Sequence, residues 1–250
     1  MIAAGWALAG RRPVAKALWR LAGGLAGLAG LFAGVAHAQE SVSFTLQSDY
    51  LLRGVSLSDG RPTLGVDIDY DAANGLYAAI SATAVDTRHA GVELLSAVAD
   101  VGYARRLKNG LSLDVGVSDS QISTFVDSRY VANYAEIYVG LARGGLAARL
   151  YFSPEYLGVT ARTLYLDVSE TVRPADHWRL TAHAGLLNVV SGDAYSLGGR
   201  SHLDLSAGVA RDFGRFETRL TASFADPPPV YPEGYRHRRA AVVAGASVYF

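Results

Sequence analysis

The chain carries three aspartates at alternate positions, Asp67, Asp69 and Asp71. Carboxylate oxygens bind hard cations such as Ca²⁺. This spacing, however, is that of one face of a β-strand, where neighbouring carboxylates lie about 6 to 7 Å apart in a line. A line of acids does not surround one ion. The pattern therefore favours a hydrated acidic surface, and no metal ligand is assigned.

Hydrolytic chemistry needs a nucleophile or activated water, a base, and a partner that orients the base. The chain has no cysteine, which excludes a thiol nucleophile and cysteine-bound metal sites. His183, His202, Asp204 and Ser206 are the one group whose types fit such a site, but they match no catalytic motif. The sequence therefore predicts no catalytic residue and no cofactor. An enzyme remains the least favoured alternative.

The last twelve residues indicate what kind of element carries the polar side chains. From Phe250 through Val248 back to Ala240, every second residue is apolar, whereas the register from Tyr249 to Arg239 is mixed. This period of two predicts a strand with one lipid-facing side and one polar side. Such a strand looks like the one that closes bacterial outer-membrane β-barrels, with Phe250 and Val248 in its assembly signal. An ordinary sandwich strand is the alternative.

The same alternation recurs along the chain and predicts twelve strands. Most are long enough to cross a membrane at a tilt, which takes about 9 to 11 residues, whereas strands of soluble proteins average about 5 to 6. The expected strands cover residues 42–50, 63–72, 76–85, 93–105, 111–118, 135–142, 146–152, 163–172, 178–187, 202–210, 216–224 and 239–250.

The connections between the expected strands alternate in length. Short breaks with turn-forming residues, such as Asn74-Gly75 and Arg143-Gly144-Gly145, follow every second strand. Short turns on one rim and long loops on the other are typical of outer-membrane barrels. The sequence therefore predicts an all-β fold, an antiparallel transmembrane up-and-down barrel of about twelve strands. The longer, mostly polar segments lie at residues 54–61, 86–91, 119–134, 153–162, 188–201 and 225–238.

Charged side chains of such a barrel must point inward, because a basic residue in the middle of the lipid face costs about 2 to 4 kcal/mol. Acids outnumber arginines in the inward registers, which favours cations in a wetted channel, although a salt-bridged plug is also compatible. The side chains assigned to the lumen are Asp49, Asp67, Asp69, Asp71, Asp100, Asp114, Glu136, Arg149, Asp167, Arg179, His183, Asp204 and Arg219.

Arg53 is expected where the first strand enters its outer loop. It lies either at the pore mouth above Asp49 or simply in a turn. An exposed ion pair would stabilise that turn by only about 0 to 1 kcal/mol, and the turn is the simpler interpretation.

Aromatic residues lie mainly near the ends of the expected strands, as a membrane girdle requires. Aromatic residues are also common in β-sheets of every kind, so this pattern adds little by itself. The residues concerned are Tyr50, Tyr70, Tyr77, Tyr103, Phe152, Trp178, Phe216, Phe224 and Phe250.

The first 38 residues combine a basic, acid-free start, an apolar run at 21–35 and an Ala36-His37-Ala38 cleavage motif. They predict a cleaved Sec-type signal peptide at 1–38, followed by the barrel at 39–250. The segment holds four of the 23 basic residues and none of the 23 acidic ones. The remainder is therefore net acidic, which argues against a nucleic-acid surface.

The segment Ser48-Asp49-Tyr50-Leu51-Leu52-Arg53-Gly54, with Pro62 and Gly75-Leu76-Tyr77, resembles the TorF-type porin family of proteobacteria, also called the Gcw_chp family. Asp100-Val101-Gly102-Tyr103 and Tyr134-Ala135-Glu136-Ile137-Tyr138 match it as well. The resemblance covers nearly all of residues 39–250, and residues 119–134 depart from it most. It implies an outer-membrane barrel with a pore and supplies no catalytic residue.

Together, the residues and the resemblance predict an outer-membrane porin, a passive narrow channel for small polar or cationic solutes. Its partners would be membrane lipid, the barrel-assembly machinery and the solutes, and not nucleic acid. A closed structural or ligand-binding barrel with functional outer loops is the alternative.

Overall fold

The computed structural model describes residues 39–87, 91–123, 131–226 and 238–250. The expected signal peptide at 1–38 lies outside the described residues. Among the described residues, no helix is long and apolar enough to cross a membrane.

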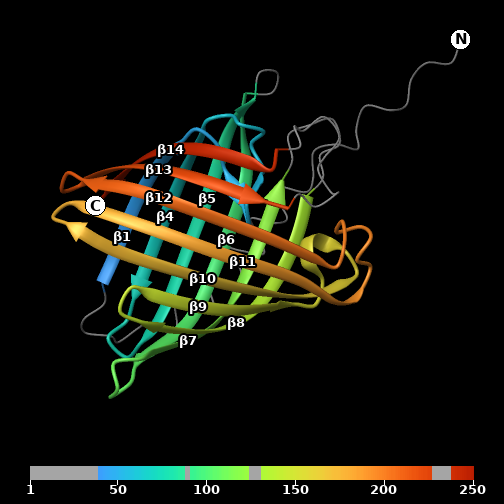
Figure 1. Cartoon of the computed structure of the whole chain (residues 1–250), viewed down its shortest axis with the longest axis horizontal. Helices are drawn as coiled ribbons and strands as arrows, with labels where there is room; N and C mark the ends of the chain where they lie inside the picture. Colours follow the sequence, from blue (N-terminus) through green and yellow to red (C-terminus); the bar gives the residue numbers. More distant parts are fainter. Residues whose placement is uncertain (1–38, 88–90, 124–130, 227–237) are drawn as a thin grey trace, which may run out of the picture.

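Twelve antiparallel strands close into a barrel, with β1 hydrogen-bonded to both β4 and β14 (Figure 1). This confirms the predicted fold class. The barrel strands are β1 (Gln39–Gln47), β4 (Thr63–Asp71), β5 (Leu76–Thr87), β6 (Gly91–Arg106), β7 (Ser112–Ser123), β8 (Val131–Arg143), β9 (Leu146–Ser153), β10 (Ala161–Ala175), β11 (Trp178–Gly192), β12 (Ser201–Asp212), β13 (Phe216–Ala225) and β14 (Ala240–Tyr249).

The alternation in the sequence becomes two faces of the barrel wall. Val117 and Ile137 pair across β7 and β8 and are 52% and 59% exposed, whereas the adjacent Ser118 and Glu136 are buried. On β14, Val242 is 66% exposed and Val243 only 8%. An apolar outer surface around a polar interior is what lipid requires, so the barrel spans a membrane.

The C-terminal strand closes the barrel as its pattern predicts. Val248 pairs with Phe44 of β1, and the rings of Phe44 and Phe250 meet edge to face at 6.0 Å. Both chain-terminal strands are therefore fixed by backbone hydrogen bonds and by an outward aromatic contact.

Two expected loops are shorter than predicted. β7 and β8 extend into the segment 119–134 and leave only residues 124–130 outside the described chain, and β5 and β6 leave only residues 88–90. Polar residues suggested a loop at 119–134. The ladder continues there because Ile122 and Tyr134 are buried against other loops of the barrel.

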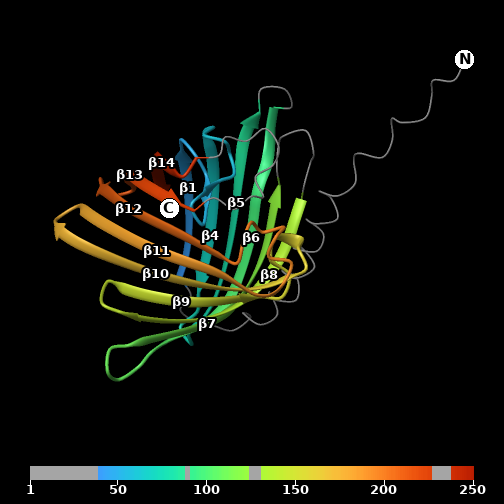
Figure 2. The ribbon, with the colours of Figure 1, turned by 45° about the vertical axis from the view of Figure 1, so that its right-hand side comes forward.

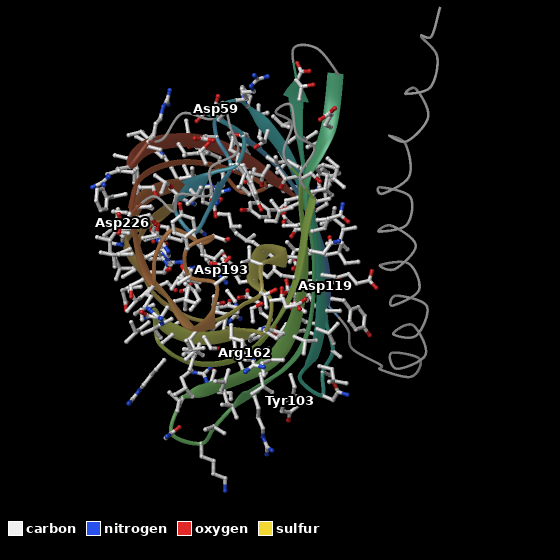
Figure 3. The ribbon with its side chains drawn as sticks, turned by 90° about the vertical axis from the view of Figure 1, so that its right-hand side faces the viewer. Asp59, Tyr103, Asp119, Arg162, Asp193 and Asp226 are labelled. Atoms are coloured by element: carbon white, nitrogen blue, oxygen red, sulfur yellow. The ribbon has the colours of Figure 1, made fainter. Side chains whose placement is uncertain are left out.

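The long-loop end of the barrel contains an apolar core. A small hairpin of β2 (Leu51–Leu52) and β3 (Val55–Ser56), called the mouth hairpin below, contributes Leu52, and Leu57 follows it. The 3₁₀ turn η1 (Tyr156–Gly158) contributes Tyr156. In Figure 3, η1 and the loop carrying Asp193 lie inside the ring of strands. The other buried members are Ile122, Tyr134, Ala161, Tyr165, Leu187, Val189 and Leu197.

Candidate functional site

The described residues line two adjoining cavities inside the barrel. The larger, about 730 Å³, reaches from the mouth hairpin to the middle of the barrel, and the smaller, about 550 Å³, lies towards the short turns. Tyr77, Arg149, Tyr151 and Asp167 line both cavities. These four residues therefore lie where the two spaces meet.

Arg53 at the tip of the mouth hairpin fastens that hairpin to the barrel wall. Its Nη2 donates to both carboxylate oxygens of Glu136 on β8, at 2.9 and 2.7 Å. Its guanidinium also lies 4.0 Å from the ring centroid of Tyr165 and 4.8 Å from that of Tyr156. Charge-assisted hydrogen bonds and cation–π contacts thus hold the Arg53 guanidinium in place.

Gly54 carries the hairpin to the other side of the mouth. Its φ is +76°, and a Cβ there would lie 2.6 Å from the Cβ of Ala225 and 2.9 Å from that of Asp204. Only glycine fits this close approach. The tip of the hairpin therefore reaches from Glu136 on β8 to Asp204 and Ala225 on β12 and β13.

Asp49 holds the base of the same loop. It accepts hydrogen bonds from the hydroxyls of Ser56 and Ser58 at 2.6 and 2.7 Å and from the backbone N–H of Gly60 at 3.2 Å. The structure thus brings Arg53 and Asp49 into one loop, but Arg53 pairs with Glu136 and not with its sequence neighbour.

A second polar cluster lies where the cavities meet. Arg149 donates to Asp114 at 2.7 Å, and the Tyr77 hydroxyl donates to the same carboxylate at 2.6 Å. Tyr77 also shares a hydrogen bond with Tyr138, whose ring lies 5.4 Å from the Arg149 guanidinium. Each polar group restrains the next, so the cluster is fixed against the wall.

His183 lies between two acids on the wall of the larger cavity. Its Nε2 lies 2.7 Å from Asp204 Oδ1, and its Nδ1 lies 3.6 Å from Asp167 Oδ1. His202 is elsewhere, within hydrogen-bonding distance of the carbonyl of Gly199. Ser206 sits opposite His183 in the strand ladder, and no hydrogen bond joins the two in the described structure. The four residues therefore do not assemble a nucleophile and its base.

The loops at the mouth carry two groups with altered pKa values. Burial raises the pKa of Tyr156, so its phenol stays neutral within the apolar core. Hydrogen bonds from the hydroxyl and backbone N–H of Ser196 hold the pKa of the exposed Asp193 below its usual range. Asp193 thus remains a carboxylate at the entrance.

A family described as "Bacterial protein of unknown function (Gcw_chp)" matches residues 34–236. The chain belongs to the Gcw_chp family. No curated protein matches it in sequence.

Solved structures with the same fold as this Gcw_chp chain include two porins. The NanC porin aligns with a TM-score of 0.55 at 11% identity, over 85% of this chain and 100% of that one. The KdgM porin, solved in complex with disordered oligogalacturonate, aligns with a TM-score of 0.51 at 10% identity, over 84% and 99%. At such identities the likeness shows the barrel fold.

Most of the side chains assigned to the lumen of this Gcw_chp barrel line one of the two cavities. Asp67 and Arg179 line neither: Asp67 accepts a hydrogen bond from Ser43, and Arg179 pairs with Glu217. The larger cavity is lined by Asp49, Arg53, Asp69, Asp100, Glu136, Arg149, Asp167, His183, Asp204 and Arg219, and the smaller by Asp71, Asp114, Arg149 and Asp167.

The inward tyrosines of the Gcw_chp barrel were missed as site residues. Tyr77 and Tyr50 were expected in a membrane girdle, yet both line the larger cavity. Their hydroxyls find polar partners there, Asp114 for Tyr77 and Ser96 for Tyr50, and lipid offers none. The alternation along β5 could have shown that Tyr77 points inward, because Tyr77 lies two residues from Ala79, which is on the inner face of the same strand.

Glycines on neighbouring strands make room for these tyrosines. Gly102 pairs with Tyr77 and Gly116 with Tyr138, and a Cβ at either glycine would lie within 2.4 Å of the tyrosine. The rings therefore lie along the Gcw_chp barrel wall and leave the centre to the cavities. Among the described residues, no cluster of histidines and acids could hold a metal ion.

Proposed function

We propose that this protein is an outer-membrane porin, a passive narrow channel for small polar and cationic solutes. The observation that carries the proposal is the pair of adjoining cavities, both lined by charged side chains, inside a barrel with an apolar outer surface. Both similar structures named above are porins, which agrees with it. The TorF-type assignment within the family belongs to the same proposal.

The charges of the larger cavity support a preference for cations. Six carboxylates and three arginines line it, together with hydroxyls such as those of Ser118 and Ser206. Hydroxyls and carboxylates can replace part of a solute's hydration shell, and an excess of negative charge raises the local cation concentration. Transport then needs no bond making, so the proposed protein is not an enzyme.

A Sec-type signal peptide at 1–38 would deliver the chain across the inner membrane. The terminal strand, with Val248 and Phe250 on its outer face, would be recognised by the barrel-assembly machinery before insertion among outer-membrane lipids.

Single-channel recording of the refolded chain 39–250 in planar bilayers tests the channel. Discrete steps with cation preference under a salt gradient are expected. The double variant Asp69→Asn, Asp100→Asn should reduce that preference. Asp67→Asn should leave it unchanged, because Asp67 lies on the same strand but lines neither cavity. Silence from protein shown to be folded and inserted would reject the channel.

A closed barrel with functional outer loops is the second candidate, and the mouth hairpin favours it. That hairpin reaches across the long-loop end and is fastened by a buried ion pair and an apolar core. If the refolded chain shows no conductance in bilayers, the proposed function becomes binding at the surface formed by these loops.

A further inference from the structure

Acidic and basic side chains line different walls of the larger cavity. Asp69 on β4 and Asp100 on β6 line one side, and Arg219 on β13 lines another. In the ring of twelve strands, β13 lies five places from β6, which carries Asp100, and three places from β4, which carries Asp69. In Figure 2, β13 lies at the upper left of the barrel and β6 at its right. Asp167 and Asp204 also line the cavity, on β10 and β12, but His183 lies between them, at 3.6 and 2.7 Å. A solute between β6 and β13 therefore meets the carboxylate of Asp100 on one wall and the guanidinium of Arg219 on the other.

These charges are available to a solute. Arg149 and Arg179 are paired with Asp114 and Glu217, whereas Arg219 forms no ion pair within the described part of the chain. The Arg219 side chain is exposed to the lumen and lies over Gly245, where a Cβ would be 3.3 Å from its Nε. The wall thus positions Arg219 without neutralising it.

The acidic wall is available in the same way. Asp69 accepts one hydrogen bond from the hydroxyl of Ser41, and it is linked to Asp100 through Ala79, which pairs with both. No base pairs with either carboxylate in the described structure. Both are partly exposed. Asp100 accepts a hydrogen bond from Ser118 and interacts with the charge of Arg149, which is itself paired with Asp114. Two carboxylates that share one wall and form no ion pair of their own attract a positively charged group.

We infer that the larger cavity selects small zwitterions, solutes that carry one cationic and one anionic group; this inference rests on the proposed channel function. The cationic group would lie against Asp69 and Asp100, and the anionic group, a carboxylate, against Arg219. An ion of a single sign meets repulsion at one wall, whereas a zwitterion aligned across the cavity is attracted by both. A volume of about 730 Å³ accommodates an amino-acid-sized solute with water.

Flux into proteoliposomes tests the inference with three labelled probes at pH 7: alanine as the zwitterion, choline as the cation and lactate as the anion. Vesicles without protein give the background. Alanine flux should fall about threefold both in Arg219→Gln and in Asp69→Asn, Asp100→Asn, the size of effect expected from ion pairs in a wetted site. Choline flux should fall only in the acid variant, and lactate flux only in Arg219→Gln.

Two matched variants control for charge removal alone. Asp67→Asn removes an acid from β4 outside both cavities, and Arg215→Gln removes an exposed arginine from the turn before β13. Neither should change any flux. Alanine flux that is unchanged in Arg219→Gln, together with choline flux that falls in the double variant Asp69→Asn, Asp100→Asn, would overturn the zwitterion inference and leave the cation channel intact. Absence of all three fluxes and of conductance would reject the channel function itself.

Discussion

Single side chains decide how wide the interior of this barrel is. Arginines lie against tyrosine rings and are paired with acids from other strands, as Arg53 with Glu136 and Arg149 with Asp114. Tyrosines lie over glycines of the neighbouring strand. Both arrangements hold bulky groups against the wall, so changes of one residue should alter conductance in a predictable direction.

Arg53→Gln should raise single-channel conductance. The substitution leaves Glu136 buried without its cation and frees the hairpin tip from the wall. Breaking a buried pair costs about 3 to 5 kcal/mol, so the urea midpoint of unfolding should also fall. Arg162→Gln is the matched control, since Arg162 is exposed at the same rim (Figure 3). Unchanged conductance in Arg53→Gln would show that the hairpin does not restrict the channel.

Gly102→Ala should lower the conductance. The new Cβ would lie 2.4 Å from the Tyr77 ring, so the ring must leave the wall and enter the space where the two cavities meet. Gly65→Ala provides the comparison, because a Cβ there has no neighbour nearer than 3.7 Å. Equal conductance of the two variants, recorded in the same bilayers, would contradict the proposed role of Tyr77.

At the scale of elements, the register of each strand determines which residues meet lipid. β7 does not end at the polar residues where the sequence pattern predicts its end. It continues because its residues still pair with β8 and because Ile122 packs in the apolar core at the mouth. A strand in a closed ring has hydrogen-bonding partners on both sides, and these partners extend it beyond its own clear alternation.

Neighbouring positions on β7 should respond very differently to lysine. Val117→Lys puts a charge in the middle of the lipid face and should destabilise the barrel by about 2 to 4 kcal/mol. Ser118→Lys points towards Glu136 and Asp100 in the larger cavity and should cost far less. Urea titration of both variants in lipid vesicles, followed by tryptophan fluorescence, measures the difference. Similar losses would mean that the assigned register is wrong.

At the scale of the whole molecule, a wide barrel is narrowed from one end. The mouth hairpin, η1 and the loop with Asp193 occupy the long-loop end, whereas the turns at the opposite rim are short. The proposed channel would therefore discriminate between solutes near one rim and in the middle of the barrel, and not along its whole length.

The exported protein should begin at Gln39. Gln39 pairs with Asp71 of β4, so cleavage before Gln39 would leave this pair in place. Intact mass measurement of the protein recovered from membranes checks the site. Ala38→Asp should block cleavage and leave a heavier, unprocessed chain. A start several residues into β1 would contradict the predicted signal peptide.

The sequence by itself determined the barrel. Period-two alternation, the alternating connection lengths and the aromatic end of β14 each depend on neighbouring residues and on the solvent that each face meets, so they can be read locally. The same parity assigned most of the inward charges, such as Asp69, Asp100 and Arg219. Strand ends were less certain, because the partner strands decide them.

Only the tertiary structure decided how the interior is filled. Arg53 pairs with Glu136, 83 residues away, and Tyr165 meets Asp204, 39 residues away. Contacts of this kind depend on which strands the ring places together and on how a loop folds into it, and no local pattern encodes either. The inward fold of the mouth hairpin also depends on such contacts, because β12 and β13 approach residue 54 so closely that only glycine fits there.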